Sequence, residues 1–110
     1  MKYTIVFYET KSGNCPVEKF LNALPVKHHA KIIRNLELLE EYGQFMQGGL
    51  ISHIKDEIWE LRTIFGGNIS RILYFTPTGN KFVLLHGFIK KTPMKEFDLA
   101  KERKRDYNIS

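Results

Sequence analysis

The stretch from Ile58 to Lys91 alternates apolar and polar positions and is rich in β-branched and aromatic side chains. Two turn signals interrupt it, Gly66-Gly67 and Gly79-Asn80. Period-2 runs separated by two-residue glycine turns are typical of antiparallel hairpins. This stretch therefore predicts three consecutive antiparallel strands, around which the rest of the chain is arranged.

The first 43 residues predict one strand and two helices. Residues 2–9 read as a strand. Pro16 fits the first position of a short helix, and Pro25 ends that helix and starts a second one, which runs to about Tyr42. So short a junction predicts a helical hairpin. The expected buried stripes are Val17, Phe20, Leu21 and Leu24 on the first helix and Ile32, Ile33, Leu36 and Leu39 on the second.

Weak periodicity over residues 44–56 predicts a loop with a helical turn. After the strands, Thr92 and Pro93 fit the cap and first position of a final helix, whose Phe97 and Ala100 face the core. The whole pattern predicts one α+β domain over residues 1–110 with a sheet of about four strands. The lone cysteine, Cys15, excludes an internal disulfide, and no apolar run approaches the ~20 residues that span a bilayer, so we expect a cytoplasmic protein.

Strand parity sorts the side chains of the three strands onto two faces. If both turns have two residues, Arg62 lies opposite Arg71, and Leu73 lies between Glu60 and His86. A three-residue turn would send Arg71 toward the core, which the cost of burying an unpaired guanidinium disfavours. The open face then holds Glu60, Arg62, Arg71, Leu73, His86, Phe88 and Lys90, and the core face holds Trp59, Leu61, Thr63, Ile72, Tyr74, Val83, Leu85 and Ile89.

The positive charge of the chain is concentrated in these strands. Residues 1–57 carry seven basic and seven acidic side chains, and residues 92–110 carry five and four. The strands carry five basic residues and one acid, Glu60, and so supply four of the net +5 charges; the basic residues are Arg62, Arg71, Lys81, Lys90 and Lys91. Two adjacent arginines fit a phosphate site, although Glu60 bridging them as a surface ion pair is a structural alternative. The basic end of the last helix has a structural explanation in the helix dipole.

The residue types on the open face favour RNA cleavage without a metal or other cofactor. Glu60 is the only carboxylate there, and the four histidines lack zinc-ligand spacing. In metal-free cleavage the ribose 2′-OH attacks the adjacent phosphate, so the protein needs a proton acceptor, a proton donor for the leaving oxygen and positive charge. Arg62 and Arg71 would supply the charge with Lys90 or Lys91, and Glu60 or His86 would accept the proton. A hydrogen-bonded, structural role is an equal alternative for His86, which lies in an apolar strand. Lys55, Lys81, Lys91 and Tyr74 are candidate substrate contacts.

The strands resemble the RelE/ParE toxin superfamily, in particular its phage-derived, HigB-like branch. Ile58–Arg62, Arg71–Phe75 and Leu84–Thr92 carry the resemblance, together with Leu36–Gly43 and, in the tail, Ala100, Arg103 and Asp106. The resemblance implies an N-terminal strand, two helices and a curved antiparallel sheet. It also implies a toxin that cleaves mRNA on the ribosome and is neutralised by an antitoxin, often a helix-turn-helix protein encoded next to it.

The resemblance points to Arg62, Arg71 and Lys90 as functional residues. The link to the last helix is short, and a catalytic tyrosine found in some relatives has no secure counterpart, because Tyr107 falls on the final helix. Some members of the superfamily inhibit DNA gyrase and cut no RNA. Three hypotheses therefore remain at this point: an mRNA endonuclease, a non-enzymatic toxin that blocks a protein target, and a module whose basic face only receives an acidic, antitoxin-like segment.

Overall fold

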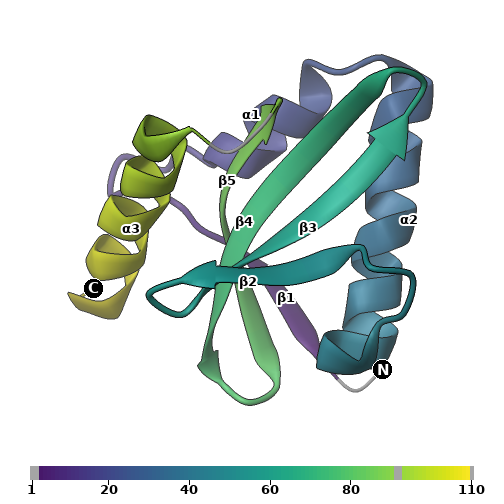
Figure 1. Ribbon diagram of the computed structural model, residues 1–110. Coiled ribbons are helices and arrows are strands. Elements are labelled where there is room, and N and C mark those ends of the chain that lie inside the picture. The colour runs from purple at the N-terminus through teal and green to yellow at the C-terminus, as the bar shows by residue number, and fades with distance from the viewer. Residues whose placement is uncertain (1–2, 91–92, 110) are drawn as a thin grey trace.

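The computed structural model describes residues 3–90 and 93–109. A twisted sheet of five strands in the order β1-β5-β4-β3-β2 forms its centre (Figure 1). Strand β1 runs parallel to β5, and the other neighbours are antiparallel, so the α+β prediction is confirmed with a mixed sheet. The elements are β1 (Thr4–Phe7), α1 (Pro16–Asn22), α2 (Val26–Tyr42), the 3₁₀ turn η1 (Gly43–Phe45), β2 (Ile51–Lys55), β3 (Ile58–Phe65), β4 (Asn68–Thr78), β5 (Lys81–Ile89) and α3 (Met94–Ile109).

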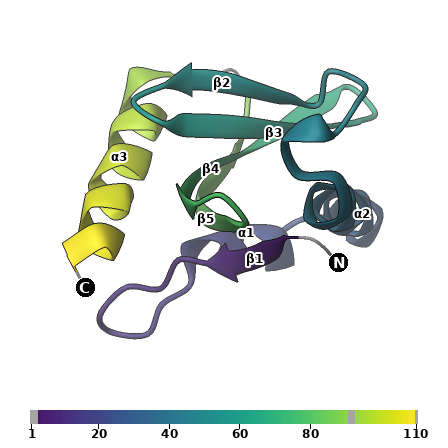
Figure 2. The same ribbon diagram turned by 90° about the horizontal axis from the view of Figure 1, so that it is seen from below.

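The sheet separates two apolar clusters, and the helices α2 and α3 lie on opposite sides of it (Figure 2). Alternation along β4 sends Ile72 and Tyr74 into the cluster with α1 and α2, whereas Leu73 and Phe75 enter the cluster with α3. Phe97 and Ala100 of α3 are buried against this second cluster, as the sequence predicts. The face expected to be open is therefore partly covered by α3.

The strand register around the two arginines is the predicted one. Arg62 pairs with Arg71, Glu60 with Leu73, and both arginine-bearing strands continue across a two-residue Gly66-Gly67 turn, where Gly66 has a φ of 61°. On β5, His86 lies opposite Leu73 and Phe88 opposite Arg71, again as predicted.

Between these points the β4–β5 register shifts by one residue and shifts back. Tyr74 pairs with Leu84 instead of Leu85, and Phe75 pairs with Val83. Val83 and Leu85 therefore pack under α3, and their assignment to the other face was wrong. Two compensating irregularities leave both ends of the pairing unchanged, which is why parity failed only in the middle.

The region 44–56 contains a strand that the sequence pattern did not predict. The expected helical turn is present as η1, but residues 51–55 form β2, the edge strand next to β3. Asp56 and Glu57, both at positive φ, connect β2 to β3. Lys101 and Lys104 of α3 form ion pairs with these two acids, at 3.4 and 3.1 Å. The basic end of α3 thus docks on this turn.

The structure describes one of the two residues that the sequence predicts at the start of α3. The expected cap Thr92 lies outside the described residues, as does Lys91. Pro93 immediately precedes the helix and accepts hydrogen bonds from the backbone N–H groups of Glu96 and Phe97. Pro93 therefore stands where the first turn begins, one residue outside the helix bounds.

Candidate functional site

Arg71 and Glu60 form the centre of the candidate site. They lie on neighbouring strands, with Nε of Arg71 3.1 Å from Oε1 of Glu60, and their side chains are 13% and 6% exposed. A mostly buried carboxylate and guanidinium depend on each other because either charge alone would be costly to bury. Glu60 therefore fixes the Arg71 guanidinium at the sheet surface beside Arg62.

The backbone of Lys90 makes a second contact with the Arg71 guanidinium. The Lys90 carbonyl accepts a hydrogen bond from Nη1 of Arg71, and the Lys90 N–H donates to the Ile69 carbonyl. Lys90 has a φ of 120°, which is unusual for a residue with a side chain. Its side chain is exposed, and its ammonium group has no acidic partner among the described residues. This strained residue both orients Arg71 and presents a positive charge.

Arg62 is held by the loop before β2. Its Nη2 donates to the Gly49 carbonyl at 2.7 Å. Its Nε is buried without a hydrogen-bond partner among the described residues, and an unsatisfied buried donor costs about 1–3 kcal/mol. The like charges of Arg62 and Arg71 on paired positions add a further unfavourable term. The arrangement thus lowers stability, which is typical of a site shaped by function.

His86 lies beneath α3 rather than open to solvent. Its Nε2 is 2.9 Å from Oε2 of Glu96, and its Nδ1 is 2.9 Å from Nη1 of Arg103, which also donates to the Leu85 carbonyl. A guanidinium can only donate, so Nδ1 accepts and the proton of the neutral ring is on Nε2, directed at Glu96. Burial lowers the pKa of Arg103. His86 thus connects β5 to α3, with both ring nitrogens engaged.

Glu96 and Arg103 are site neighbours that the sequence reasoning missed. Glu96, Ala100 and Arg103 follow the spacing i, i+4, i+7, which places them on one stripe of a helix. Because Ala100 was correctly assigned to the core side, the same spacing could have assigned the two charged residues to the inner face as well. The helix dipole offered an explanation for Arg103 within the basic end of the helix, and Glu96 was assigned no role.

The other candidate residues that the structure describes lie away from the arginine pair. Tyr74 is 2% exposed on the α1 and α2 side of the sheet, where burial raises its pKa, so it cannot contact a substrate on the other face. Lys81 begins β5 and lies eight residues from Ile89, about 26 Å along a strand. The ammonium group of Lys55 lies 5.0 Å from the ring centre of Phe97. Lys91 lies outside the described residues.

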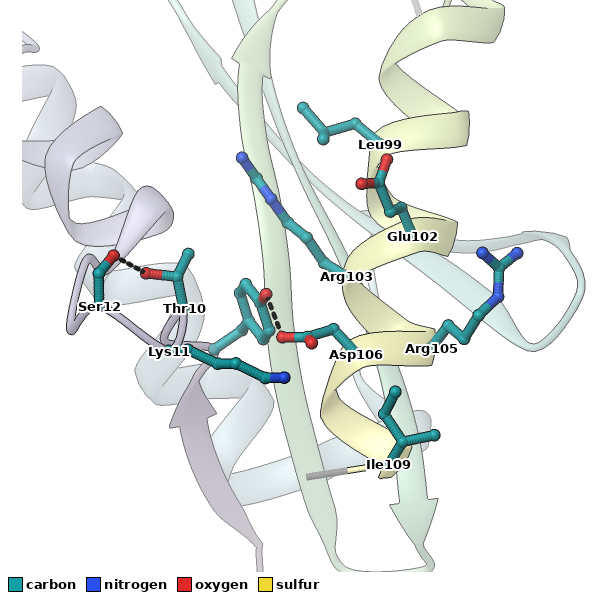
Figure 3. A pocket seen from close by; sticks show the side chains of 10 residues that line it. Thr10, Lys11, Ser12, Leu99, Glu102, Arg103, Arg105, Asp106 and Ile109 are labelled. Atoms are coloured by element: carbon teal, nitrogen blue, oxygen red, sulfur yellow. Dashed lines mark hydrogen bonds between the residues drawn. The ribbon is translucent and has the colours of Figure 1, made fainter.

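Several hollows flank α3, and a small one adjoins the candidate site. A hollow of about 260 Å³ includes Lys90, Lys95 and Glu96 in its lining. A larger one of about 610 Å³ lies between α3 and the loop after β1 (Figure 3). There the Tyr8 hydroxyl donates to Oδ2 of Asp106 at 2.7 Å, and burial with this contact raises the pKa of Tyr8 to about 12. The larger hollow contains none of the predicted site residues.

The described residues contain no group of three or more His, Cys, Asp or Glu side chains placed to hold a metal ion. No helix in the described part of the chain has the length and apolar character needed to cross a membrane.

Comparison with known families gives one match over most of the chain. The family described as phage-derived protein Gp49-like matches residues 19–105, which include β2 to β5 and most of α3. The chain belongs to the Gp49-like family. This is a RelE/ParE-like toxin family, so the resemblance of the strand motifs is confirmed at the level of the superfamily. No curated protein matches the chain.

The Gp49-like match includes every residue of the arginine site. Glu60, Arg62, Arg71 and Lys90 lie within residues 19–105, as do Glu96 and Arg103 of α3. The N-terminal strand β1 lies outside the matched part. Membership of this family agrees with a toxin-like protein of phage origin.

Proposed function

We propose that this protein is the toxin of a type II toxin–antitoxin pair and acts as a metal-independent, HigB-like endonuclease on mRNA bound to the ribosome. The observation that carries the proposal is the pairing of Arg62 with Arg71, with Arg71 held by Glu60 and by the Lys90 carbonyl. Planar guanidinium groups in fixed positions are suited to a phosphodiester. The membership of the chain in a toxin-like family also supports a toxin function.

In this proposal the protein mainly stabilises charge. The ribose 2′-OH attacks the adjacent phosphorus and gives its proton to the acceptor, while the bond from phosphorus to the 5′-oxygen of the next nucleotide breaks and that oxygen takes up a proton from the Lys90 ammonium group or from water. Negative charge grows on the phosphate oxygens of the transition state. Arg71, preoriented by two partners, and the exposed ammonium group of Lys90 would neutralise that charge. Preorientation matters because it avoids reorganisation at the moment of reaction.

Both candidate proton acceptors already have partners in the structure. Glu60 forms an ion pair with Arg71, and both nitrogens of His86 contact α3 residues. Of the two, Glu60 lies next to the arginines, so we assign it the role of acceptor and assign His86 a structural role. A protein with so few accessible acid–base groups would rely on the ribosome to position the RNA, which accounts for the proposed dependence on translation.

A second function has a specific observation in its favour. Because both conventional acceptors are engaged, the same surface fits a toxin that binds a protein target such as DNA gyrase without cutting RNA. In either case the proposed partner is an antitoxin, a helix-turn-helix protein encoded next to the toxin. If the basic face served only to receive an acidic antitoxin segment, a protein lacking both arginines would lose antitoxin binding.

Induced expression in bacteria tests the proposal. We expect growth arrest that the neighbouring gene relieves, with new mRNA ends and no DNA-damage response. Arg62→Ala and Arg71→Ala should each restore growth, whereas Arg34→Ala, an exposed arginine of α2, should leave toxicity unchanged. Arrest with intact mRNA and induced DNA damage would favour the gyrase-type toxin. Arrest by the double arginine variant would refute the role of the pair, and retained antitoxin binding by that variant would exclude the module that only receives an antitoxin.

A further inference from the structure

The 260 Å³ hollow lined by the end of β5 and the first turn of α3 has a direct connection to the arginine site. Lys90 lines the hollow, and its own carbonyl binds Arg71. A ligand group in the hollow would therefore lie beside a phosphate held by Arg71. The lining residues are Phe88, Ile89, Lys90, Pro93, Lys95 and Glu96.

The charged residues of the hollow are available to a ligand. Neither Lys90 nor Lys95 has an acidic partner among the described residues, and both side chains are exposed. Glu96 uses Oε2 to contact His86, and no described residue hydrogen-bonds to Oε1. The Glu96 side chain is only 18% exposed, so its second oxygen is a strong acceptor in a partly dry site. The hollow thus offers two cations and one acceptor.

The other walls are apolar. Phe88, Ile89 and Pro93 contribute a ring and aliphatic surface, and Phe88 in turn stacks on His86 with ring centres 5.4 Å apart. Apolar walls with one polar acceptor and flanking cations match a nucleotide, whose base is flat and whose phosphates are anionic. The volume of about 260 Å³ lies just below the range of about 300–1,000 Å³ that holds drug-sized ligands, so a single base is a suitable occupant.

We propose that this hollow receives the base next to the cleaved phosphodiester, and that Glu96 selects a base with an exocyclic amino group over uracil. The inference rests on the proposed endonuclease function. Adenine, cytosine and guanine each offer an amino group to a carboxylate oxygen. Uracil offers only a ring N–H as a donor. The two carbonyl oxygens on either side of that N–H are repelled by the carboxylate. Lys90 and Lys95 would contact the phosphates on either side of the base.

The position of the proton on the His86 ring determines how Glu96→Gln would change the preference for a base. Arg103 fixes the ring proton on Nε2, so that His86 donates to residue 96. A glutamine has one carbonyl oxygen, which His86 would occupy, and its NH₂ would then face the hollow as a donor. The variant should therefore lose the preference for amino-bearing bases and shift toward uracil, whose carbonyls accept.

Cut-site sequencing tests this. Purified protein would be added to a purified translation system with an mRNA library of randomised codons, and the bases flanking each cut would be counted against the input. For the wild type we expect amino-bearing bases over uracil by roughly fivefold or more at one flanking position, the size of one good base contact. Glu96→Gln should reduce that ratio to below about twofold or invert it. Lys95→Ala should lower the yield of cuts with the ratio unchanged.

The matched control is Glu102→Gln, an exposed glutamate of the same helix outside this hollow. It should cut with the wild-type ratio, and thermal melting should show that both glutamine variants are folded. Cutting by the wild type without discrimination at any flanking position, or an unchanged ratio in folded Glu96→Gln, would overturn the inference while leaving the endonuclease standing. No cutting by the wild type would instead refute the endonuclease, and the inference with it.

Discussion

Glu60 and Arg71 form a mostly buried ion pair across strands β3 and β4, with Nε and Oε1 3.1 Å apart. Arg62, the residue paired with Arg71 on β3, points to the same face two residues after Glu60. One carboxylate beside two guanidinium groups leaves the site with excess positive charge.

Glu60→Ala should lower the free energy of unfolding by roughly 3 kcal/mol, because Arg71 would keep a mostly buried charge without its carboxylate beside the like charge of Arg62. Urea denaturation of the wild type and the variant gives the difference. Glu37→Ala, at an exposed position on α2, should change it by less than about 0.5 kcal/mol. A similarly small loss for Glu60→Ala would mean that the pair behaves as a surface ion pair.

Lys90→Gly should stabilise the fold and weaken the toxin. At a φ of 120° a glycine avoids a strain of about 1–3 kcal/mol, and the carbonyl that binds Arg71 is retained. The variant would lose the ammonium group and so should reduce growth inhibition. Lys81→Gly is the comparison, since the first residue of β5 has no positive φ to relieve and a glycine there should destabilise by about 0.5–1 kcal/mol. Loss of stability in Lys90→Gly would show that the lysine side chain contributes packing that outweighs the strain.

Arg103→Lys should loosen α3 from the sheet. A lysine cannot reproduce the fixed fork that reaches both the Leu85 carbonyl and Nδ1 of His86, and a buried acceptor left unpaired costs about 1–3 kcal/mol. Nitrogen NMR should show His86 protonated on Nε2 in the wild type and a mixture of tautomers in the variant. Arg105→Lys, at an exposed position, should preserve both the stability and the tautomer. A wild-type ring protonated on Nδ1 would contradict the hydrogen-bond assignment.

His28 should make the fold less stable in mild acid. Its side chain is 2% exposed and stacks on Phe65, and burial, with a smaller effect of Lys31, lowers its pKa from 6.5. The unfolded chain therefore binds the proton more readily, so His28 contributes no penalty above pH 6.5 and an increasing one as the pH falls below it. His28→Phe should make the urea midpoint less dependent on pH between about pH 7.5 and 5.5, whereas His29→Phe should leave the pH dependence of the midpoint unchanged. An unchanged pH dependence in His28→Phe would place the sensitivity elsewhere.

The sequence was sufficient to predict the arginine pair because the register depends on local features. Gly66-Gly67 limits the hairpin turn to two residues, and alternation then places Arg62 opposite Arg71. The cost of a buried, unpaired guanidinium selected the same register. Glu60 also followed from parity, although its burial did not, because burial depends on packing around the strand.

Features that depend on distant parts of the chain could not be predicted in this way. The apolar run Val83–Leu85 contains no residue that indicates the one-residue shift in the β4–β5 register. The edge strand β2 is stabilised by its pairing with β3, which its own sequence does not show. The contacts of His86 with Glu96 and Arg103 arise from the position of α3 on the sheet. Strand parity describes one element at a time, so it placed His86 on the open face and gave no sign that α3 covers that residue.

The most direct test of the central claim compares two copies of one mRNA, one with a start codon and one without, in a purified translation system. Primer extension would locate new ends after addition of the wild-type protein, Arg71→Ala or Arg34→Ala. The account predicts cuts only in the translated copy, with the wild type and with Arg34→Ala but not with Arg71→Ala. Cuts in the untranslated copy, or undiminished cutting by folded Arg71→Ala, would contradict it.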